Sequence, residues 1–431
     1  MKCIKINLSI FLYITIVYCF GKFENYKENN ISLINNNERI KRSISFQRYQ
    51  DKLKNNDHYK KKRMFLSQLR NKVEISIPYY VEHNVNYQLV DLALQFIQQE
   101  TCLKFVKQQK MIPTSLGLQY SFGSKCTSST EKKTNKQWKK ISIASDCSNI
   151  ESIQRETMHS LGFIYTQNRF DRDKYLRLLT KSINHYYLSY FKKTSYFNSK
   201  TFGVSFDYGS VLMLKPYEYS NNARTMIPYD LNFYNTMGTE EKLTFNDVKL
   251  INIKFCQKIC TNNIKCMNEG YQDPNDCKKC KCVKGFFGAW CQLLPPTSRE
   301  CGETVIKAGN SITLLEMEGR HKCIYHIFSE KRKKIALYIL SKGFFSSNKN
   351  LCYKRNSLEV KYWKDKAPTG ARFCSLDKNT LVVTENNHGI IYFRSKYNLN
   401  RVKILLKSVE VYFNEHNIKN EFMKEKLTFN L

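Results

Sequence analysis

Long hydrophobic runs are nearly absent from this 431-residue sequence. The one apolar run covers residues 6–20 and follows two lysines, Lys2 and Lys5. A run of that length behind a basic start predicts a secretory signal over residues 1–21, whereas a transmembrane helix, the alternative, needs a longer run and a stop-transfer flank. No later segment is long and apolar enough to span a bilayer. We therefore expect a secreted, extracellular protein without a transmembrane segment.

Acidic residues are also scarce. Aspartate and glutamate together number 37 against 70 lysines and arginines, which leaves a formal net charge of +33. Such an excess can mark a polyanionic partner, such as a sulfated glycan, a nucleic acid or an anionic membrane. Export argues against nucleic acid. Lysine, asparagine, isoleucine, tyrosine and phenylalanine are all abundant, as codon bias in an AT-rich genome produces, so compositional drift and a selected polyanion-binding face both stay open.

The number and spacing of the cysteines predict the domain plan. A chain of this length is too long for one core and predicts two or three domains. Of its 16 cysteines, Cys3 and Cys19 leave with the signal, and the remaining 14 form an even set, as pairing in an oxidising compartment requires. Three of them are widely spaced, seven lie within residues 256–291 and four follow. This grouping predicts a small disulfide-held module between two larger domains.

Residues 22–63 are polar, rich in asparagine and lysine and without periodicity, which predicts a disordered pro-segment. Two basic runs within it, residues 39–42 and 60–63, have the form that processing proteases cut. Lysine-rich sequence also yields such runs by chance, so both interpretations stay open.

Ordered structure is predicted from residue 73 onwards. Residues 73–81 have the composition of a strand, and the apolar residues of the next segment recur at helical spacing as far as Cys102: Leu89, Leu92, Ala93, Phe96 and Ile97. Ile141 and Ile143 alternate with polar residues, as in a strand. Ser148 with Glu151 predicts a capping box that begins a helix running to Gly162.

This capped helix and the residues after it carry a recognisable motif. Residues 155–175 can be compared with the pattern H-E-x-x-H-x-x-G-F-x-H-E-x-x-R-x-D-R-D-x-Y. Nine positions match in register, namely Glu156, His159, Gly162, Phe163, Arg169, Asp171, Arg172, Asp173 and Tyr175. The sequence therefore resembles the astacin family of zinc peptidases. The resemblance implies an α+β fold with an astacin-like metzincin peptidase domain over residues 64–256.

Several positions depart from the family pattern. In the intact motif, histidines four residues apart share one helix face and bind one zinc with a third histidine after the glycine. Here Arg155 and Tyr165 stand at the first and third ligand positions. Leu212 replaces the methionine that underlies the metal, Leu214 replaces the additional tyrosine ligand, and Thr166 replaces the motif's second glutamate. The resemblance therefore implies a degenerate metal site.

Two site residues remain. Glu156 is the remnant of the general base, and His159 is the remnant of the second metal ligand. His83 and His185, the other histidines of this domain, neighbour asparagines in polar stretches and are expected at the surface. We expect no cofactor, unless zinc is held by displaced ligands, and an ion pair between Glu156 and the adjacent Arg155.

The family resemblance also implies two disulfides in the peptidase domain, Cys102–Cys256 and Cys126–Cys147. Residues 257–292 resemble an EGF-like domain, with a C-x-C pair and glycines in the final loop. Its family order implies the pairs Cys260–Cys277, Cys266–Cys280 and Cys282–Cys291. A zinc site is the alternative for such clustered cysteines and is disfavoured by export. Lys254 and Phe255 precede the module where a calcium-binding variant needs acidic residues, so calcium is not expected.

The last part, residues 301–412, resembles a CUB domain, an all-β sandwich. It contains four disulfide cysteines, Cys301, Cys323, Cys352 and Cys374, and alternating stretches typical of strands at residues 335–340 and 402–406. Asn356 stands where many relatives have a calcium-binding aspartate, so no ion is expected. Residues 413–431 form a charged C-terminal tail.

The order peptidase, EGF-like, CUB is typical of secreted astacins of nematode type. Three hypotheses follow from it. The first is a catalytically inactive homologue that binds an extracellular protein or glycan through its cleft, EGF-like and CUB modules. The second is a zinc-dependent metalloendopeptidase with weak or altered activity. The third is a drifting paralogue without a selected role.

Overall fold

The structure is a computed structural model that describes residues 3–5, 17–19, 75–111, 116–128, 138–220, 223–239, 241–340, 344–345, 351–374 and 379–428. The chain divides into two units, Met1–Arg63 and Met64–Leu431. In the first unit, β1 (Cys3–Lys5) pairs antiparallel with β2 (Val17–Cys19). The rest of the predicted signal and the whole predicted pro-segment lie outside the described residues. No helix in the described part of the chain has the length and apolarity needed to cross a bilayer.

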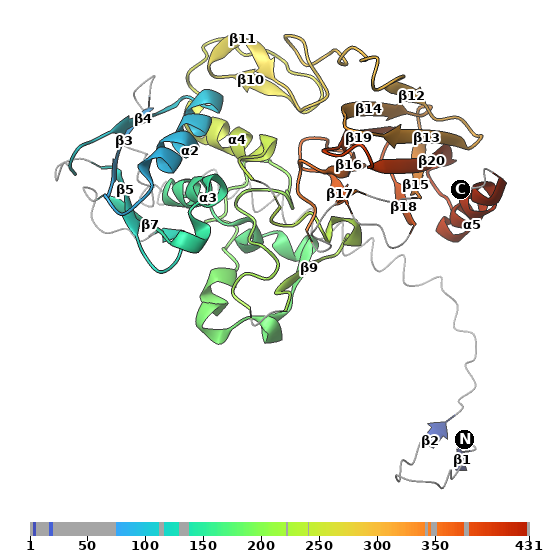
Figure 1. The fold of residues 1–431 in the computed structure, drawn as a ribbon, viewed down its shortest axis with the longest axis horizontal. Coiled ribbons are helices and arrows are strands. Elements are labelled where there is room, and N and C mark those ends of the chain that lie inside the picture. Colours follow the sequence, from blue (N-terminus) through green and yellow to red (C-terminus); the bar gives the residue numbers. More distant parts are fainter. Residues whose placement is uncertain are drawn as a thin grey trace, which may run out of the picture. The chain divides into compact units, whose positions relative to one another are not determined.

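The second unit begins with a domain of residues 75–256, the first domain (Figure 1). Its N-terminal half, residues 75–162, is a five-stranded sheet with helices α2 (Tyr87–Glu100) and α3 (Ile150–Ser160) packed together. Four strands are parallel and the edge strand β6 is antiparallel. The sheet order is β4 (Leu103–Lys107), β3 (Ile75–Val81), β5 (Leu118–Phe122), β7 (Lys139–Ile143) and β6 (Thr127–Ser128).

Burial in this half follows the periodicity of the sequence. In β3 the side chains of Ile75, Ile77 and Tyr79 are buried and Ser76 is exposed, as one-sided strand packing requires. The buried face of α2 consists of Val90, Ala93, Leu94 and Ile97, which is the i, i+3, i+4, i+7 pattern. Leu92 was predicted to lie on this face, but its side chain is exposed because it lies on the opposite side of the helix.

The start of α3 differs from the predicted capping box. Asn149 is the N-cap, and its side-chain oxygen accepts from the backbone N–H of Ser152 at 2.9 Å. Ser148 instead ends a short 3₁₀ turn, η3 (Ser145–Cys147), which is tied by the disulfide of Cys147, so it is not free to cap the helix. At the other end, Gly162 has φ +82°, a left-handed conformation that allows the chain to turn sharply after the helix.

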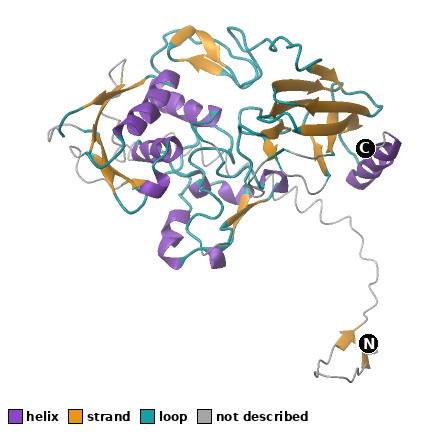
Figure 2. Cartoon of the chain, viewed as in Figure 1, coloured by secondary structure: helices purple, strands orange, loops and turns teal. Residues whose placement is uncertain are grey.

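The C-terminal half of the first domain, residues 163–240, has little regular structure (Figure 2). Two short strands that are distant in sequence, β8 (Leu176–Leu178) and β9 (Met226–Pro228), pair antiparallel. The other elements are short 3₁₀ helices: η4 (Thr166–Asn168), η5 (Arg172–Lys174), η6 (Thr180–Ser182), η7 (His185–Phe191) and η8 (Leu231–Phe233). Helix α4 (Phe245–Ile251), begun by a capping box of Thr244 and Asp247, and the π-helical turn η9 (Asn252–Cys256) complete the domain. The disulfides Cys102–Cys256 and Cys126–Cys147 are the pairs that the family resemblance implies.

The cysteine-rich segment, residues 257–292, contains one antiparallel hairpin, β10 (Tyr271–Asp273) with β11 (Asp276–Lys281). Three disulfides hold it together because it has few apolar residues to bury. They are Cys260–Cys277, Cys266–Cys280 and Cys282–Cys291, the first-third, second-fourth, fifth-sixth order.

Residues 301–410 form two packed sheets, the C-terminal sandwich, with disulfides Cys301–Cys323 and Cys352–Cys374. The first sheet has the order β12 (Val305–Lys307), β14 (Lys322–Phe328), β19 (His388–Arg394), β16 (Ser357–Lys361) and β17 (Ala371–Phe373). The second sheet has the order β13 (Thr313–Glu318), β20 (Arg401–Glu410), β15 (Lys333–Ile339) and β18 (Thr380–Val383).

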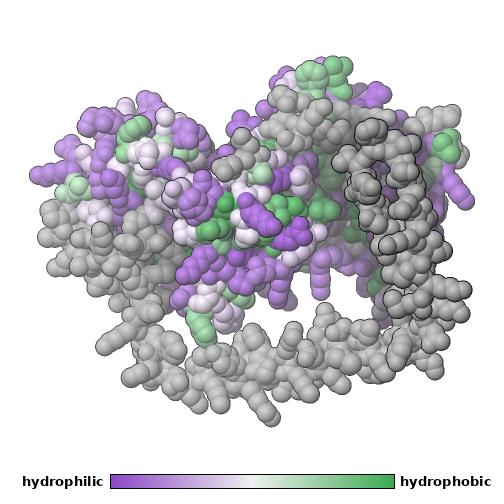
Figure 3. Space-filling view, turned by 90° about the horizontal axis from the view of Figure 1, so that it is seen from below, coloured by the Kyte–Doolittle hydropathy of each residue, from purple (hydrophilic) through white to green (hydrophobic). Residues whose placement is uncertain are grey.

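The predicted C-terminal tail contains a helix, α5 (Glu415–Thr428). It is attached to the second sheet by Phe422, which is fully buried and stacks on Tyr338 with ring centroids 5.5 Å apart. Most of the other side chains of α5 are exposed. Figure 3 shows a face of the molecule on which hydrophilic side chains predominate and hydrophobic ones form small separate patches.

Candidate functional site

Helix α3 carries Arg155, Glu156 and His159 into the interior of the first domain. Arg155 and His159 are four residues apart and therefore lie on one face of the helix. The side chains of Arg155 and Glu156 are 5% and 2% exposed, so their charges must be compensated by neighbouring groups. The contacts of these residues define the site.

Arg155 lies among three carboxylates. Its Nη1 is 3.7 Å from Glu151 and 3.5 Å from Glu218, and its Nε is 3.6 Å from Glu156. Burial by itself lowers the pKa of the Arg155 guanidinium, but the carboxylates of Glu218, Glu156 and Glu151 outweigh burial and raise it. The guanidinium therefore carries a permanent positive charge at the position where the family pattern has a zinc ligand.

The ion pairs of Arg155 continue into a network that joins the two halves of the first domain. Lys215, in the C-terminal half, places its Nζ 3.5 Å from Glu151 on α3. Its backbone N–H donates to Glu218 at 3.2 Å, which fixes the carboxylate that faces Arg155. Charged groups from α3 and from residues 215–218 thus connect the two halves of the domain.

Glu156 is held by hydroxyl groups. Its Oε2 accepts from Ser128 Oγ at 2.9 Å and from the Tyr165 hydroxyl at 2.8 Å. Burial raises the pKa of the Glu156 carboxyl, although Arg155, Tyr165 and Ser128 each lower it. Burial and the neighbouring Glu156 raise the pKa of Tyr165 well above its usual value, so this phenol stays neutral. A neutral phenol that donates to a carboxylate is not available as a metal ligand.

His159 faces the same serine. Its Nδ1 is 2.8 Å from Ser128 Oγ, and its ring stacks on Tyr165 with centroids 4.1 Å apart and planes 17° from parallel. Burial, with a contribution from Lys139, lowers the pKa of His159 to about 4, so the imidazole is neutral at neutral pH. Ser128 thus connects both remnant residues, and Tyr165 covers one face of the imidazole.

Leu212 and Leu214 lie beside this site in the segment of residues 207–214, and both are buried. Leu212 belongs to the same apolar cluster as Tyr165, and its carbonyl accepts from the Thr166 N–H at 3.0 Å. Leu214 donates its N–H to Gln167 Oε1 at 3.3 Å. Both positions therefore pack as ordinary core residues.

Five residues of the site were predicted from the sequence, and four others were not. Arg155, Glu156, His159, Tyr165 and Leu212 come together, whereas His83 and His185 are exposed. The missed residues are Ser128, Glu151, Lys215 and Glu218. Glu151 is four residues before Arg155 on α3, and this ion-pair spacing was readable in the sequence. The other three are distant in sequence from their partners and have no local signal.

The donor set does not fit a zinc ion. A zinc site needs three or four nitrogen, sulfur or carboxylate ligands directed at one point. Among the residues that the structure describes, no group of three histidines, cysteines, aspartates or glutamates could hold a metal. His159 is the only imidazole that the motif supplies, Glu156 faces Ser128 and Tyr165, and Arg155 adds a positive charge beside them.

Comparison with curated proteins finds zinc metalloproteinases of nematodes. The chain is 32% identical to zinc metalloproteinase nas-34 of Caenorhabditis elegans, over 77% of this chain and 55% of that protein. It is 31% identical to zinc metalloproteinase nas-23 of the same organism, over 68% and 56% of the two chains. Zinc metalloproteinase dpy-31 of Caenorhabditis elegans is 27% identical, over 72% and 54%. The chain thus spans about half the length of the curated relatives it matches.

A solved structure and a family model also match the chain. The hatching enzyme high choriolytic enzyme 1 of Oryzias latipes, a zinc protease, matches with 22% identity and a TM-score of 0.38, over 42% of this chain and 90% of that chain. The model of the astacin peptidase family matches residues 66–256. With 32% identity to nas-34 over 77% of its length and this match over residues 66–256, the chain belongs to the astacin family.

Proposed function

We propose that this protein is a secreted astacin homologue without peptidase activity that acts by binding extracellular proteins or glycans. The observation that carries the proposal is the position of Arg155. Its buried guanidinium lies among Glu151, Glu156 and Glu218, where the family pattern has its first zinc ligand. An enzyme of this family activates a zinc-bound water, and these residues give the metal no place to bind.

A comparison of the electrostatic repulsion with the free energy of zinc binding supports the same conclusion. A unit positive charge about 4 Å from a divalent cation costs roughly 8 kcal/mol at an effective dielectric constant of about 20. A complete structural zinc site contributes about 10–16 kcal/mol. Two of the three histidine ligands are replaced here, by Arg155 and Tyr165, so the attraction falls well below that range. Repulsion then exceeds attraction.

The rest of the chain supports a binding role. The disulfide order of the cysteine-rich segment supports its interpretation as an EGF-like domain, and the two-sheet sandwich with two disulfides supports a CUB domain. Modules of these kinds bind proteins or glycans, and the net charge of +33 adds polyanions as candidate partners. The Asn356 amide is hydrogen-bonded within the sandwich, since it donates to the Phe345 carbonyl at 3.0 Å and accepts from Asn400 at 2.8 Å.

Two measurements on the secreted protein test the proposal. We expect less than about a tenth of an equivalent of zinc per chain after gel filtration, because the bound metal would face the charge of Arg155. We also expect no cleavage of casein or gelatin. Stoichiometric zinc that is lost in His159→Ala, together with cleavage that a chelator abolishes, would show instead a zinc peptidase built on Glu156 and His159.

A further inference from the structure

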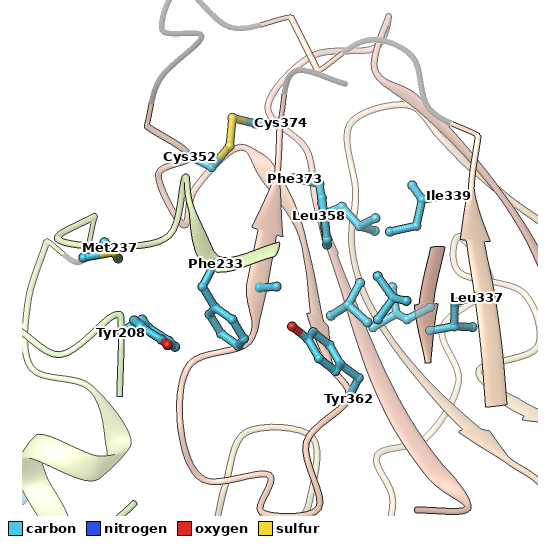
Figure 4. Close-up of a cluster of buried hydrophobic side chains, with 14 of the residues drawn as sticks. Tyr208, Phe233, Met237, Leu337, Ile339, Cys352, Leu358, Tyr362, Phe373 and Cys374 are labelled. Atoms are coloured by element: carbon cyan, nitrogen blue, oxygen red, sulfur yellow. A yellow bond between two sulfur atoms is a disulfide. The ribbon is translucent and has the colours of Figure 1, made fainter. Parts of the chain in front are cut away.

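The C-terminal half of the first domain and the C-terminal sandwich share one apolar core. A single cluster of buried side chains contains Phe206, Tyr208 and Phe233 of the first domain together with Leu358 and Phe373 of the sandwich. Figure 4 shows Phe233 and Tyr208 on one side of this cluster and Tyr362 on the other. Separate modules on a flexible linker would each bury their own core, so this shared core indicates a permanent contact.

One loop of the sandwich places aromatic side chains in this contact. We call residues 362–370, between β16 and β17, the docking loop. Its aromatic residues enter the first domain: the Trp363 ring centroid is 4.8 Å from Phe233 and 5.9 Å from Tyr208, and that of Tyr362 is 5.8 Å from Phe233. The Tyr362 hydroxyl and, at 3.3 Å, the Trp363 indole N–H both donate to the Asp230 carboxylate.

Buried hydrogen bonds fix the position of the docking loop. The Thr369 N–H donates to Asp207 Oδ1 at 3.1 Å. Packing is also close there, because a Cβ on Gly209 would meet the Thr369 side chain at 2.5 Å. Asp207 and Gly209 begin the segment that carries Leu212 and Leu214 into the degenerate site. The sandwich therefore holds the segment whose Leu212 packs in one apolar cluster with Tyr165 of the site.

Strand β17, directly after the loop, adds further bonds. The Arg372 N–H donates to Thr236 Oγ1 at 2.8 Å, and Arg372 Nη1 donates to Thr239 Oγ1 at 3.1 Å. The Cys352 N–H, held by the disulfide with Cys374, donates to the Asn235 carbonyl at 2.9 Å. Because these donors and acceptors are buried, loss of one partner leaves the other unsatisfied, and the contact is held in one register.

From these contacts we propose that the C-terminal sandwich is a fixed intramolecular partner of the first domain, docked through residues 362–372 on the surface formed by Asp207, Gly209, Asp230, Phe233 and Thr236. The sandwich is then a structural part of the peptidase fold in this chain. This proposal is independent of the proposed function, since it holds with or without zinc.

A consequence follows for external partners. The outer face of the first sheet also contacts the cysteine-rich segment, where His326 Nε2 is 2.9 Å from the Gly285 carbonyl and Tyr392 donates to the Lys284 carbonyl at 2.6 Å. The outer face of the second sheet is covered by α5 through Phe422. Part of each outer sheet face is therefore occupied by the chain itself and is closed to an extracellular partner.

The linker before Cys301 allows a direct test. Residues 296–300 are exposed and outside helices and strands, and each of the seven disulfides in the described part of the chain joins cysteines on one side of this linker. A specific protease site is inserted there in the full chain, which is folded and then cut. We expect the two pieces to co-elute in gel filtration at micromolar concentration without denaturant. Separation of the pieces would overturn the proposal.

A double variant tests whether the docking loop holds the cut pieces together. The pair Asp230→Ala with Trp363→Ala should weaken association of the cut pieces at least 100-fold. Arg401→Ala, which removes an exposed ion pair with Glu318 on the second sheet, should leave it unchanged. If the Asp230 and Trp363 variant stays fully associated, the cysteine-rich segment holds the pieces and the docking loop is not the contact.

Should that variant fail to fold, hydrogen exchange on the unmodified chain decides. The amides of Thr369 and Arg372, which donate to Asp207 and Thr236, should exchange as slowly as those in the centre of β19. Fast exchange of both amides in an otherwise protected sandwich would contradict the proposal.

Discussion

Arg155 Nη1 lies 3.5 Å from Glu218 Oε2, although the two residues are 63 positions apart in the chain. Glu218 approaches from the C-terminal half of the first domain, and Arg155 belongs to α3 in the N-terminal half. This buried ion pair therefore joins the two halves of the first domain, and the charge of Arg155 is compensated within the protein.

Restoring two ligands should restore the metal. We expect the double variant Arg155→His with Tyr165→His to bind about one zinc per chain, since His159 then has two partners and the opposing charge is gone. Peptidase activity should lag behind zinc binding, because Leu212 and Leu214 remain. Metal analysis with a casein assay measures both. The triple variant that adds His159→Gln is the control and should lose the zinc again.

Removing the positive charge alone should destabilise the protein. Arg155→Met leaves Glu151, Glu156 and Glu218 without their cation, and we expect a loss of about 3–5 kcal/mol in the free energy of unfolding. The matched control is Arg401→Met, whose exposed pair with Glu318 should contribute less than about 1 kcal/mol. Urea denaturation measures both. Equal stability of the two variants would contradict a compensating role for Arg155.

The Tyr165 hydroxyl should matter for stability. Tyr165→Phe removes a donor from the buried Glu156 carboxylate, and we expect a loss of about 1–3 kcal/mol in the free energy of unfolding, measured by urea denaturation. Tyr186→Phe, at a residue that is 76% exposed, should change stability by less than about 0.5 kcal/mol. If Tyr165→Phe leaves the free energy of unfolding unchanged, the hydrogen bond from Ser128 is sufficient for the buried Glu156 carboxylate.

Acidification should destabilise the sandwich because the buried His388 resists protonation. Burial, with Lys366 and His326 adding to it, lowers the pKa of His388 to about 3 in the folded protein. Between about pH 6.5 and 3 the unfolded state therefore binds more protons than the folded state. The contribution of neutral His388 to the free energy of unfolding is complete above pH 6.5 and is lost as the pH falls. Between pH 6.5 and 4.5 the loss amounts to about 2–3 kcal/mol.

The His388→Asn variant isolates this effect. Its free energy of unfolding should fall less than that of the unmodified protein between pH 7 and 4.5, by roughly 2 kcal/mol. His416→Asn, at an exposed position of α5, should follow the unmodified protein. Parallel pH profiles for all three proteins would assign the acid sensitivity to other groups.

The origin of the net charge can also be measured. If compositional drift produced the +33, the protein should elute at the same ionic strength from heparin and from a cation exchanger of matched charge density. We expect this equal elution, because lysine is abundant together with asparagine and isoleucine throughout the chain. Later elution from heparin, with a steep dependence on salt, would indicate a selected polyanion-binding face.

Much of the first domain could be predicted from local sequence. Periodicity placed β3, α2 and α3, because apolar residues repeat at the spacing of the face that they bury. The predicted N-cap of α3 was wrong by one residue. Ser148 and Asn149 both have capping side chains, and only the disulfide of Cys147 and its 3₁₀ turn decided which of them caps the helix.

The sequence alone determined which positions depart from the family motif, because Arg155 and Tyr165 are read directly where that motif has histidines. It could not name Ser128 or Glu218, which contact the motif from distant parts of the chain. Nor could it place Trp363 against Phe233. Ligand spacing is a local property of one helix, whereas charge compensation and docking depend on long-range packing, and only the tertiary structure decided them.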